Sequence, residues 1–546
     1  MKTAIRIVML LSVLSHVASS QEIFDAIRNG DLDRVKELVE RDSQLIKART
    51  ADQSSLLLVA VSVSNKPIAE YLIEKGADVN VANASQWTPL FYAQSVEFAE
   101  LLLENGADID FGIPDYPPVL HLLWSGHQEV AEHLLEKGAS IPGAESQYGV
   151  VTAIHAIKTG CVPYAEKALG KVIDPSYVSE GGSNLLHFAA SGTTVELVEK
   201  LIGFGVSLKK KNIYGLTPLH NAVMQGNTEI VRLSINKGAD INSRTADGRS
   251  AYNIALEEEN DEIVQCLLSS GADTNPQEFP VVNGEYMGQL TPGNKAIPFA
   301  PGLVSGQHSY HGSIVFTANR MEMYWSVEVL SEMSNSIFWS RLENGAWTQP
   351  EFFSKGDVPF ISPDGRKMFY VLLKETDDER CEVIMARDRA ETGWSEPYEL
   401  PENVNSIPRI HWQVSVDRQG NLYYGADFGA GDNIYYSEYE NGIYADPKRI
   451  EMLDNVNAFS PYIAPDGSYM IVSIEREGER MALMFRRNDG NWTEPVDIAE
   501  YIGREMGYCP IVTHDSKYLF FLSGLERMYA PFWVNAGFIE ELRPKE

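Results

Sequence analysis

The side chains best suited to chemistry lie in the C-terminal half of the chain, on short apolar runs that alternate with turns. His308 and His311 have the spacing of a His-x-x-His metal pair, but we interpret them as the polar end of a strand and predict no metal site. Asp357 is the main carboxylate in these runs, and no second carboxylate stands out as its acid–base partner. The polar and aromatic candidates are His308, Tyr310, His311, Asp357, Arg409, His411, Gln413, Tyr462 and Tyr508.

Sequence motifs of the common catalytic machineries are missing. The chain has no H-E-x-x-H, no G-x-S-x-G and no glycine loop of the kind that cradles phosphates. Its four cysteines are spread singly and form no C-x-x-C pair, so zinc and redox motifs are also absent. These patterns favour a binding protein over an enzyme and predict no cofactor.

Length and charge limit the classes of partner. A chain of 546 residues is too long for one ordinary core, so two or more domains are expected. The 45 basic and 76 acidic residues give 45 − 76 = −31, a balance that disfavours binding to nucleic acid or to anionic membrane surfaces.

The N-terminus has the layout of a secretory signal peptide. Lys2 and Arg6 precede an apolar run, and small residues follow at 18–20. The apolar run is too short to span a bilayer, and no later segment reaches that length, so membrane insertion is not expected. The sequence predicts an exported protein, periplasmic or secreted.

The first half of the chain repeats a short pattern. In its clearest copy, Pro218 suits the first turn of a helix, Gly226 suits the left-handed end of that helix, and Gly238 stops a second amphipathic helix. The steps between copies of "GAD" are 30, 32, 100 and 33 residues, and 100 is close to three periods. The glycines of these copies are Gly76, Gly106, Gly138, Gly238 and Gly271. A stack of helical hairpins with a period near 33 residues is predicted.

The T-P-L-H motif at Thr217 and the T-P-L motif at Thr88 resemble the ankyrin repeat. The resemblance covers about 22–275, with degenerate copies around 147–178. It implies an α-solenoid that binds proteins through its turn tips and the concave face of its first helices. The matching positions are Trp87, Tyr92, Trp124, Tyr214, Leu216, Met224, Arg249 and Tyr252.

The histidine of the T-P-L-H motif has a structural role in ankyrin proteins, where it ties neighbouring turns together by hydrogen bonds. By resemblance, His121, His187 and His220 would take that role here. Phe91 departs from the pattern, so the tie is not expected in its unit.

After Asn275 the amphipathic helices stop and a different repeat begins. Turn signatures such as "SPDGRKMFYV" and "APDGSYMIVS" each join two apolar strands. A second marker, as in "NGAWTQP" and "TGWSEP", keeps the same period. Its aromatic residues are Trp347, Trp394, Tyr444 and Trp492, at steps of 47, 50 and 48 residues. Four short strands per period of this length predict the blades of a β-propeller.

The S/A-P-D-G turn resembles the WD-like propeller repeats of the Tol-B type, over about 286–546. Asp364 and Asp466 lie in these motifs, and we interpret them as turn residues that bond their own backbone. Five blades are predicted, with six as the alternative. The segment "NKAIPFAPGLVS" is expected to complete the last blade and so close the ring, which removes exposed sheet edges. The innermost strands would then bring the polar candidates together along a central channel.

The expected fold is therefore multidomain, an ankyrin α-solenoid followed by an all-β propeller. The expected segments are a signal peptide at 1–20, the solenoid at 21–275, a linker with the ring-closing strand at 276–306, and the propeller at 307–546. The expected function is that of an exported scaffold whose solenoid binds a protein and whose propeller binds a second protein, a peptide or a glycan. The alternative is a hydrolase or lyase that acts on a glycan or peptide in the channel.

Overall fold

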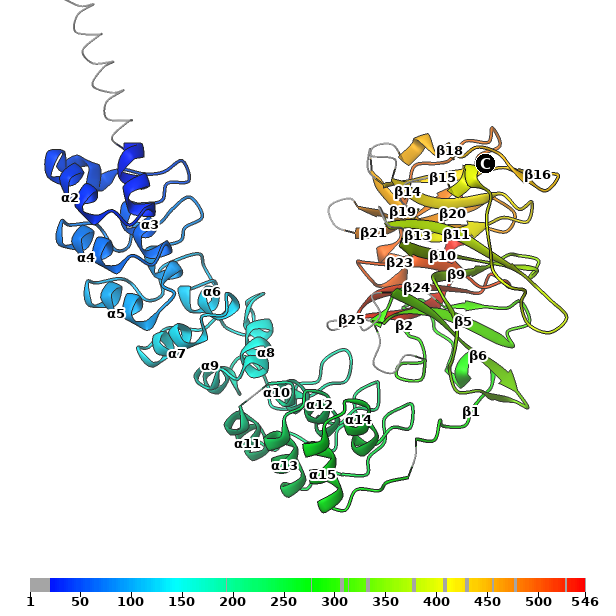
Figure 1. Ribbon diagram of the computed structural model, residues 1–546, viewed down its shortest axis with the longest axis horizontal. Coiled ribbons are helices and arrows are strands. Elements are labelled where there is room, and N and C mark those ends of the chain that lie inside the picture. The colour runs from blue at the N-terminus through cyan, green and yellow to red at the C-terminus, as the bar shows by residue number, and fades with distance from the viewer. Residues whose placement is uncertain are drawn as a thin grey trace, which may run out of the picture. The chain divides into compact units, whose positions relative to one another are not determined.

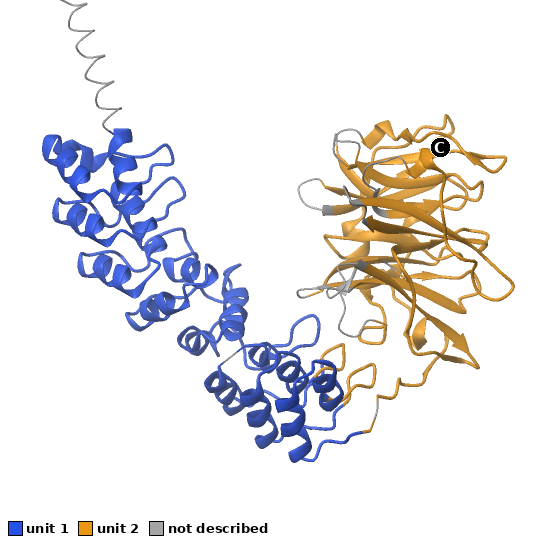
Figure 2. Ribbon diagram, in the orientation of Figure 1, with its two compact units in different colours: residues 1–211, 217–243, 251–274 blue, residues 212–216, 244–250, 275–546 orange. Residues whose placement is uncertain are grey.

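A computed structural model describes residues 20–545, apart from 193, 276, 305–308, 313, 330–333, 376–379, 406–409, 428–431, 454–455, 476–478 and 526–527. At 309, 310, 329, 334, 375, 380, 410–412, 479 and 528 only the backbone is described. The described residues form two compact units (Figure 2). The first comprises residues up to 211 together with 217–243 and 251–274; the second comprises 212–216, 244–250 and 275–546.

The first unit is a stack of short helices in pairs (Figure 1). The first elements of successive pairs are α3 (Leu56–Ser62), η2 (Pro89–Tyr92), α6 (Pro118–Trp124), α8 (Gly149–Thr159), α10 (Leu185–Ala190), α12 (Pro218–Met224) and α14 (Ala251–Glu257). The second elements are α4 (Lys66–Glu74), α5 (Val96–Glu104), α7 (Gln128–Glu136), α9 (Val162–Ala168), α11 (Val195–Gly203), α13 (Thr228–Asn236) and α15 (Asp261–Ser269). Ahead of them lie α2 (Leu32–Arg41) and η1 (Ser43–Lys47).

Local sequence explains where these helices begin and end. Pro218 opens α12, where its missing N–H needs no partner. The side chain of Asn227 caps α13 by accepting a hydrogen bond from the N–H of Ile230 at 3.0 Å. Gly238 follows α13 with a φ of 92°, a conformation that favours glycine because it has no Cβ. Both predicted helices of this repeat are therefore confirmed.

The described residues of the second unit form five blade sheets and one small two-stranded sheet, all built from antiparallel neighbours. The first blade contains β3 (Ser309–Tyr310), β4 (Val315–Phe316), β5 (Glu322–Val329), β6 (Ser334–Glu343) and β8 (Glu351–Lys355). The second contains β9 (Asp357–Ile361), β10 (Lys367–Glu375), β11 (Arg380–Asp388) and β12 (Tyr398–Glu399). The third contains β13 (Ile410–Val416), β14 (Leu422–Asp427), β15 (Asp432–Ser437) and β18 (Lys448–Arg449).

The fourth blade contains β19 (Asn457–Ile463), β20 (Tyr469–Glu475), β21 (Glu479–Phe485) and β22 (Val496–Asp497). The fifth contains β23 (Tyr508–Val512), β24 (Tyr518–Leu525), β25 (Met528–Asn535) and, from the start of the unit, β2 (Ile297–Pro298). The smaller elements are β1 (Val282–Asn283), β7 (Ala346–Trp347), β16 (Tyr439–Glu440), β17 (Ile443–Tyr444), η3 (Glu285–Gly288), η4 (Glu451–Leu453), α16 (Glu402–Asn405), α17 (Ala499–Ile502) and α18 (Phe538–Glu541). Five blades are confirmed.

Strand β2 closes the ring as the sequence predicts. Ile297 lies opposite Trp533 and Pro298 opposite Phe532, so β2 forms the outer edge of the fifth blade. The pairing joins two segments from opposite ends of the unit, which leaves the last blade complete.

The aspartates of the blade turns have the predicted structural role. Asp364 accepts hydrogen bonds from the N–H of Arg366 at 3.0 Å and from the hydroxyl of Ser362 at 2.6 Å. Asp466 accepts from the N–H of Ser468 at 3.0 Å. Both carboxylates therefore hold their turns by hydrogen bonds to nearby residues.

The innermost strands share an irregularity that shapes the channel. The pairing register of β9, β13, β19 and β23 shifts at the same place in each blade, which is the mark of a β-bulge. Val358, Ser460 and Cys509 lie in three of these bulges with φ of 43°, 49° and 50°. Such values are unfavourable for residues with a Cβ, so the surrounding blades must hold the bulges in place.

Candidate functional site

A cluster of aromatic rings lies on the first helices and preceding turns of three successive hairpins in the first unit. We define the aromatic face as Trp87, Tyr92, Tyr116, His121, Trp124, Tyr148 and His155. Leucines and valines on the other side of the same helices, such as Leu120 and Leu123, are buried in the core of the unit. The helical period therefore leaves the rings on the opposite side, partly open to solvent.

The rings touch one another in sequence along the face. The ring centroids of Trp87 and His121 are 4.5 Å apart, and those of His121 and Tyr116 are 6.3 Å apart. Tyr116 in turn lies 5.1 Å from Tyr148. Contacts of this kind fix the rings without immobilising flexible chains, which makes a rigid surface for binding.

Trp124 is the most exposed ring of the face, at 44%. It stacks on His155 with a centroid distance of 4.6 Å and an interplanar angle of 4°. Its indole N–H donates a hydrogen bond to the hydroxyl of Thr152 at 3.2 Å, which fixes its orientation. A large, oriented and exposed tryptophan is the kind of residue that carries much of the binding energy in protein interfaces.

The histidine and two of the tyrosines at the centre of the aromatic face are uncharged near neutral pH. Burial lowers the pKa of His121, and the nearby His127 lowers it further, so the imidazole stays neutral. Burial raises the pKa of Tyr92 and of Tyr116, so both phenols stay protonated. An absence of charge at the centre is typical of surfaces that bind proteins.

The other residues predicted for the solenoid surface have different positions. Met224 and Tyr252 are half-buried in the first unit. Tyr214 and Leu216 are also half-buried and belong to the second unit. Arg249 is 7% exposed, and its Nε lies 2.8 Å from a carboxylate oxygen of Asp247. Arg249 therefore has a structural ion pair in place of the exposed position that the sequence suggested.

Two of the histidines predicted to tie neighbouring turns, His220 and His121, have different contacts. The Nε2 of His220 lies 3.0 Å from the carbonyl oxygen of Ser243, and its Nδ1 accepts from the N–H of Thr217 at 3.0 Å. This is the predicted tie between neighbouring turns. His121 instead lies 3.4 Å from the hydroxyl of Ser125 in its own helix and is surrounded by the rings of the aromatic face.

Sequence reasoning missed Tyr116, Tyr148 and His155 as members of this face. Tyr116 could have been found from the sequence, because it stands shortly before α6 as Trp87 stands before η2. His155 could be found only through the packing of α6 against α8, which the degenerate repeat around 147–178 obscured.

The second candidate site is the start of the propeller channel. The residues that directly precede the bulges occupy equivalent positions in the second to fifth blades, as the strand registers show. In the first blade His311 lies at the corresponding point, where its N–H donates to the carbonyl oxygen of Ser326 at 3.1 Å. These residues are His311, Asp357, His411, Phe459 and Tyr508. Three of the nine channel candidates lie in this ring of equivalent blade positions and have side chains that the structure describes. They are His311, Asp357 and Tyr508.

Asp357 is held by a dense set of donors. Its Oδ1 accepts from the hydroxyl of Ser326 at 2.6 Å and from the N–H of Val358 at 2.8 Å. Its Oδ2 accepts from the amide of Asn335 at 2.6 Å and forms an ion pair with Nδ1 of His311. Both carboxylate oxygens are thus occupied, which suits orientation of His311 better than proton transfer to a ligand.

The electrostatics of this pair follow from its surroundings. Burial acts to raise the pKa of Asp357, but the charge of His311 and the hydrogen bonds to the carboxylate outweigh it and lower the pKa. Burial acts to lower the pKa of His311, but the charge of Asp357 and their hydrogen bond outweigh it and raise the pKa. The pair is therefore stabilised in its ionised form.

Two other channel candidates fill space between blades. The amide of Gln413 donates to the carbonyl oxygens of Pro461 at 3.2 Å and Pro510 at 2.8 Å, and so links three blades. Tyr462 is buried, and its hydroxyl donates to the carbonyl oxygen of Val512 at 3.3 Å. Both side chains have structural contacts. His308 and Arg409 lie outside the described residues, as do the side chains of Tyr310 and His411.

Comparison with known proteins bears on the first half of the chain. The family described as ankyrin repeats (3 copies) matches residues 23–112 and 185–278. The N-terminal half contains ankyrin repeats. The match omits 113–184, the region that contains the degenerate copies and five of the seven residues of the aromatic face.

Individual relatives agree over short stretches. The ankyrin repeat and SAM domain-containing protein 6 of Rattus norvegicus is 30% identical over 92 residues, 16% of this chain and 10% of that protein. The E3 ubiquitin-protein ligase XBAT32 of Arabidopsis thaliana is 27% identical over 204 residues, 36% of this chain and 38% of that protein. The chain thus spans well under half the length of either relative. The human ASB11 ankyrin repeat domain has 24% identity and a TM-score of 0.27, covering 46% of this chain and 99% of that one.

Two further features are absent from the described residues. None of the described helices is long and apolar enough to cross a membrane. No group of three or more histidine, cysteine, aspartate or glutamate side chains in the described part of the chain could hold a metal ion.

Proposed function

We propose that this chain is a scaffold that binds a protein partner through the aromatic face of its ankyrin repeats. The observation that carries the proposal is the set of partly exposed rings on three successive hairpins. The rings from Trp87 to Tyr148 contact one another, and beside them Trp124 stacks on His155. Ankyrin repeats bind proteins, and an aromatic surface of this kind supplies the anchors that such an interface needs. The partner surface is expected to be apolar or aromatic.

The propeller is the second binding platform of this proposed scaffold, for another protein, a peptide or a glycan. Its channel begins in a ring that combines the Asp357–His311 pair with the aromatic side chains of Phe459 and Tyr508. Polar and aromatic side chains that converge on one mouth are a usual basis for ligand binding.

The proposed location of the scaffold is outside the cytoplasm, periplasmic or secreted. The support is the signal-like sequence before Gln21, whose first nineteen residues lie outside the described part of the chain. N-terminal sequencing of the protein recovered from outside the cell is expected to start at Gln21. An intact Met1 in that material, or a purely cytoplasmic location, would reject this part of the proposal.

Capture of partners by the full chain tests the aromatic face. Wild-type protein and Trp124→Ala are used as baits in extract, and retained proteins are quantified by mass spectrometry. Trp124→Ala is expected to lose at least one discrete protein that the wild type retains. Once purified, that partner is expected to bind Trp124→Ala at least tenfold more weakly than the wild type. Leu268→Ala is the matched control, because Leu268 is also exposed but lies on a second helix of its repeat.

The control separates the proposed face from general stickiness. If every retained protein survives Trp124→Ala, or is lost equally from Leu268→Ala, the aromatic face is not the binding surface. Circular dichroism of both variants must match the wild type, so that a loss of capture reports on contact and not on folding.

A further inference from the structure

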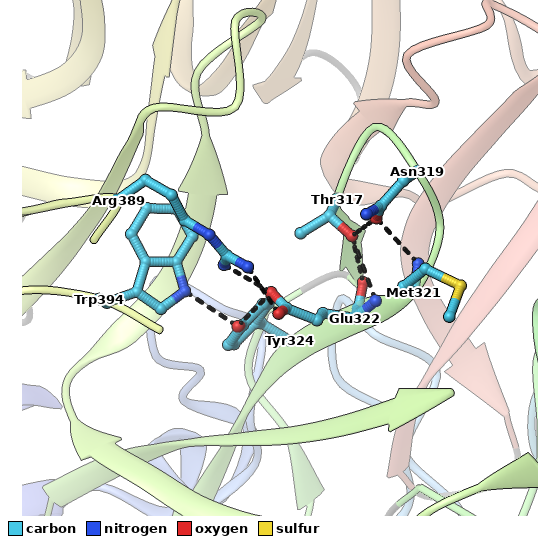
Figure 3. A network of polar contacts seen from close by, with 7 residues as sticks. All are labelled: Thr317, Asn319, Met321, Glu322, Tyr324, Arg389 and Trp394. Atoms are coloured by element: carbon cyan, nitrogen blue, oxygen red, sulfur yellow. Dashed lines mark hydrogen bonds and ion pairs between the residues drawn. The ribbon is translucent and has the colours of Figure 1, made fainter. Parts of the chain in front are cut away.

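The same arginine–tryptophan pair occurs at two interfaces between neighbouring propeller blades, which we call seams. We call a seam closed where a carboxylate of the protein pairs with the arginine, and only one of the two seams is closed. Between the first and second blades, Arg389 lies over the ring of Trp394, with its Cζ 4.9 Å from the ring centroid. Its two terminal nitrogens donate to the two carboxylate oxygens of Glu322, each at 2.7 Å. Figure 3 shows this bidentate pair and the hydroxyl of Tyr324, which donates to the same carboxylate at 2.9 Å.

The seam between the third and fourth blades repeats this arrangement. Arg486 and Trp492 form an isolated antiparallel β-bridge, as Arg389 and Trp394 do. The Cζ of Arg486 lies 5.6 Å from the ring centroid of Trp492. Tyr423 stacks on Tyr436 at a centroid distance of 5.9 Å, the same distance as between Tyr324 and its cross-strand neighbour Trp339. The two seams therefore have matching walls.

One substitution distinguishes the seams. Glu322 stands two residues before Tyr324, and the position two residues before Tyr423 is Asn421. The amide of Asn421 donates to a carboxylate oxygen of Asp417 at 2.9 Å, and its oxygen accepts from the N–H of Tyr439 at 2.9 Å. Asn421 is thus bound within its own blade, and no counterpart of Glu322 is found among the described residues of the seam between the third and fourth blades.

The result is an open groove with a cationic lining. Its volume is about 760 Å³, and its walls include Tyr436, Lys448, Arg449, Arg486, Arg487 and Trp492. Among the described residues, no carboxylate lies within 4 Å of the guanidinium nitrogens of Arg486 or Arg487, although Glu451 also lines the groove. Lys448 is paired with Glu438 at 3.1 Å, so the guanidinium groups of Arg486 and Arg487 are the cations that the groove offers to a ligand in a chain with a net charge of −31.

Tyr423 adds a hydrogen-bond donor to this groove. Burial, together with the charge of Asp417, raises the pKa of its hydroxyl to about 12, against the opposing effect of Arg486. The phenol therefore stays protonated at neutral pH. It matches Tyr324, whose hydroxyl donates to Glu322 in the closed seam.

We propose that the groove between the third and fourth blades binds an acidic peptide segment of a partner protein, with a glutamate or aspartate carboxylate on Arg486. The closed seam supports this choice of occupant, because its own occupant is a protein glutamate held between an arginine, a tyrosine hydroxyl and a tryptophan. The volume of the groove falls in the range of ligand sites and leaves room for residues on either side of that carboxylate. The proposal rests on the role of the propeller as a second platform, but not on the aromatic face.

Fluorescence polarisation of the full chain with labelled peptides tests the proposal. The probes are an eight-residue peptide of alternating glutamate and glycine and its glutamine counterpart. The glutamate peptide is expected to bind at least tenfold more tightly, and its binding is expected to weaken between 50 and 300 mM salt because the charges are screened. The double variant Arg486→Gln, Arg487→Gln is expected to lose at least tenfold in affinity for the glutamate peptide.

A matched variant controls for net charge. Arg232→Gln combined with Lys237→Gln removes two exposed cations from the ankyrin repeats and is expected to leave peptide affinity unchanged. Equal binding of both peptides, or equal effects of the two double variants, would overturn the proposal. If polygalacturonate alone binds in an Arg486-dependent manner, the acidic peptide is the wrong occupant. Each of these failures leaves the capture test with Trp124→Ala intact, so the two proposals can fail separately.

Discussion

The two halves of this molecule each use one repeat position in two ways. In the ankyrin half, the imidazole of His220 has hydrogen-bond partners in the backbone of Thr217 and Ser243, whereas that of His121, at the corresponding position, lies among aromatic rings. We call the first histidine closed and the second open. In the propeller half, Arg389 is closed by Glu322, whereas Arg486 faces an open groove. In the propeller half the closed copy also shows which partner chemistry the position accepts, because the partner of Arg389 is a carboxylate.

The two halves differ in the chemistry of the open residue, which is His121 in the ankyrin half and Arg486 in the propeller half. The imidazole of His121 remains uncharged and joins an aromatic surface, so its environment favours apolar partners. The guanidinium of Arg486 keeps its charge and favours an anion. A repeat protein can therefore create a binding position by withdrawing one internal partner, and the chemistry of that position follows from the side chain that is left.

The largest expected effect is the loss of a closed histidine. His220→Ala removes a fully buried side chain and leaves the N–H of Thr217 and the carbonyl of Ser243 without their partner. We expect the free energy of unfolding of the ankyrin half to fall by about 3 kcal/mol. Urea denaturation followed by circular dichroism at 222 nm measures this change. His121→Ala is the matched control and is expected to cost under about 1 kcal/mol; equal losses would remove the distinction between closed and open histidines.

A smaller effect is expected for the closed arginine. Glu322→Gln leaves the partly buried guanidinium of Arg389 without its counter-charge, and we expect a loss of about 2 kcal/mol. Denaturation followed by tryptophan fluorescence reports on this change, since most tryptophans lie in the propeller. Arg486→Gln, on an exposed side chain with no carboxylate partner among the described residues, is expected to change stability by less than about 0.5 kcal/mol. A similar loss in both variants would show that the seams are equivalent.

Features of the fold that depend on neighbouring residues could be predicted from the sequence. The prolines, glycines and capping side chains of each helical hairpin act within one turn of chain, and the Asp-Gly turns of the blades do the same. Two markers at one period then indicated five blades. The segment that resembles the end of each blade, around Ile297, indicated how the ring closes, and the pairing with Trp533 confirms it.

Side-chain partners that come from other blades or repeats could not be predicted in this way. Glu322 and Arg389 are 67 residues apart, and their contact depends on how two blades pack. Gln413 looked like a channel residue, yet it spans to Pro461 and Pro510 because the bulges bring those carbonyls within reach. The burial of Arg249 against Asp247 likewise depends on a turn conformation that its residue type does not reveal.

The channel pair offers a closed ion pair whose cation can titrate, which sharpens the comparison with Arg389. The folded-state pKa of His311 is raised, so its contribution to stability is fully present below its unfolded pKa of about 6.5 and is lost as the pH rises through the folded pKa. Asp357 has a lowered pKa and stays ionised over this range, and the charges of the nearby Glu328 and Glu382 also act to raise the pKa of His311. The wild type should therefore exceed His311→Asn in stability by about 1 kcal/mol more at pH 5.5 than at pH 9.

The matched control has the opposite sign. Burial lowers the pKa of His514, so its contribution is present above its unfolded pKa and is lost as the pH falls through the folded pKa. The advantage of the wild type over His514→Asn should thus be larger at pH 9 than at pH 5.5. Denaturant unfolding of both variants at the two pH values distinguishes the cases. If the two differences change with pH in the same direction, Asp357 does not hold His311 in its charged form, and the channel pair is not comparable to Arg389 and Glu322.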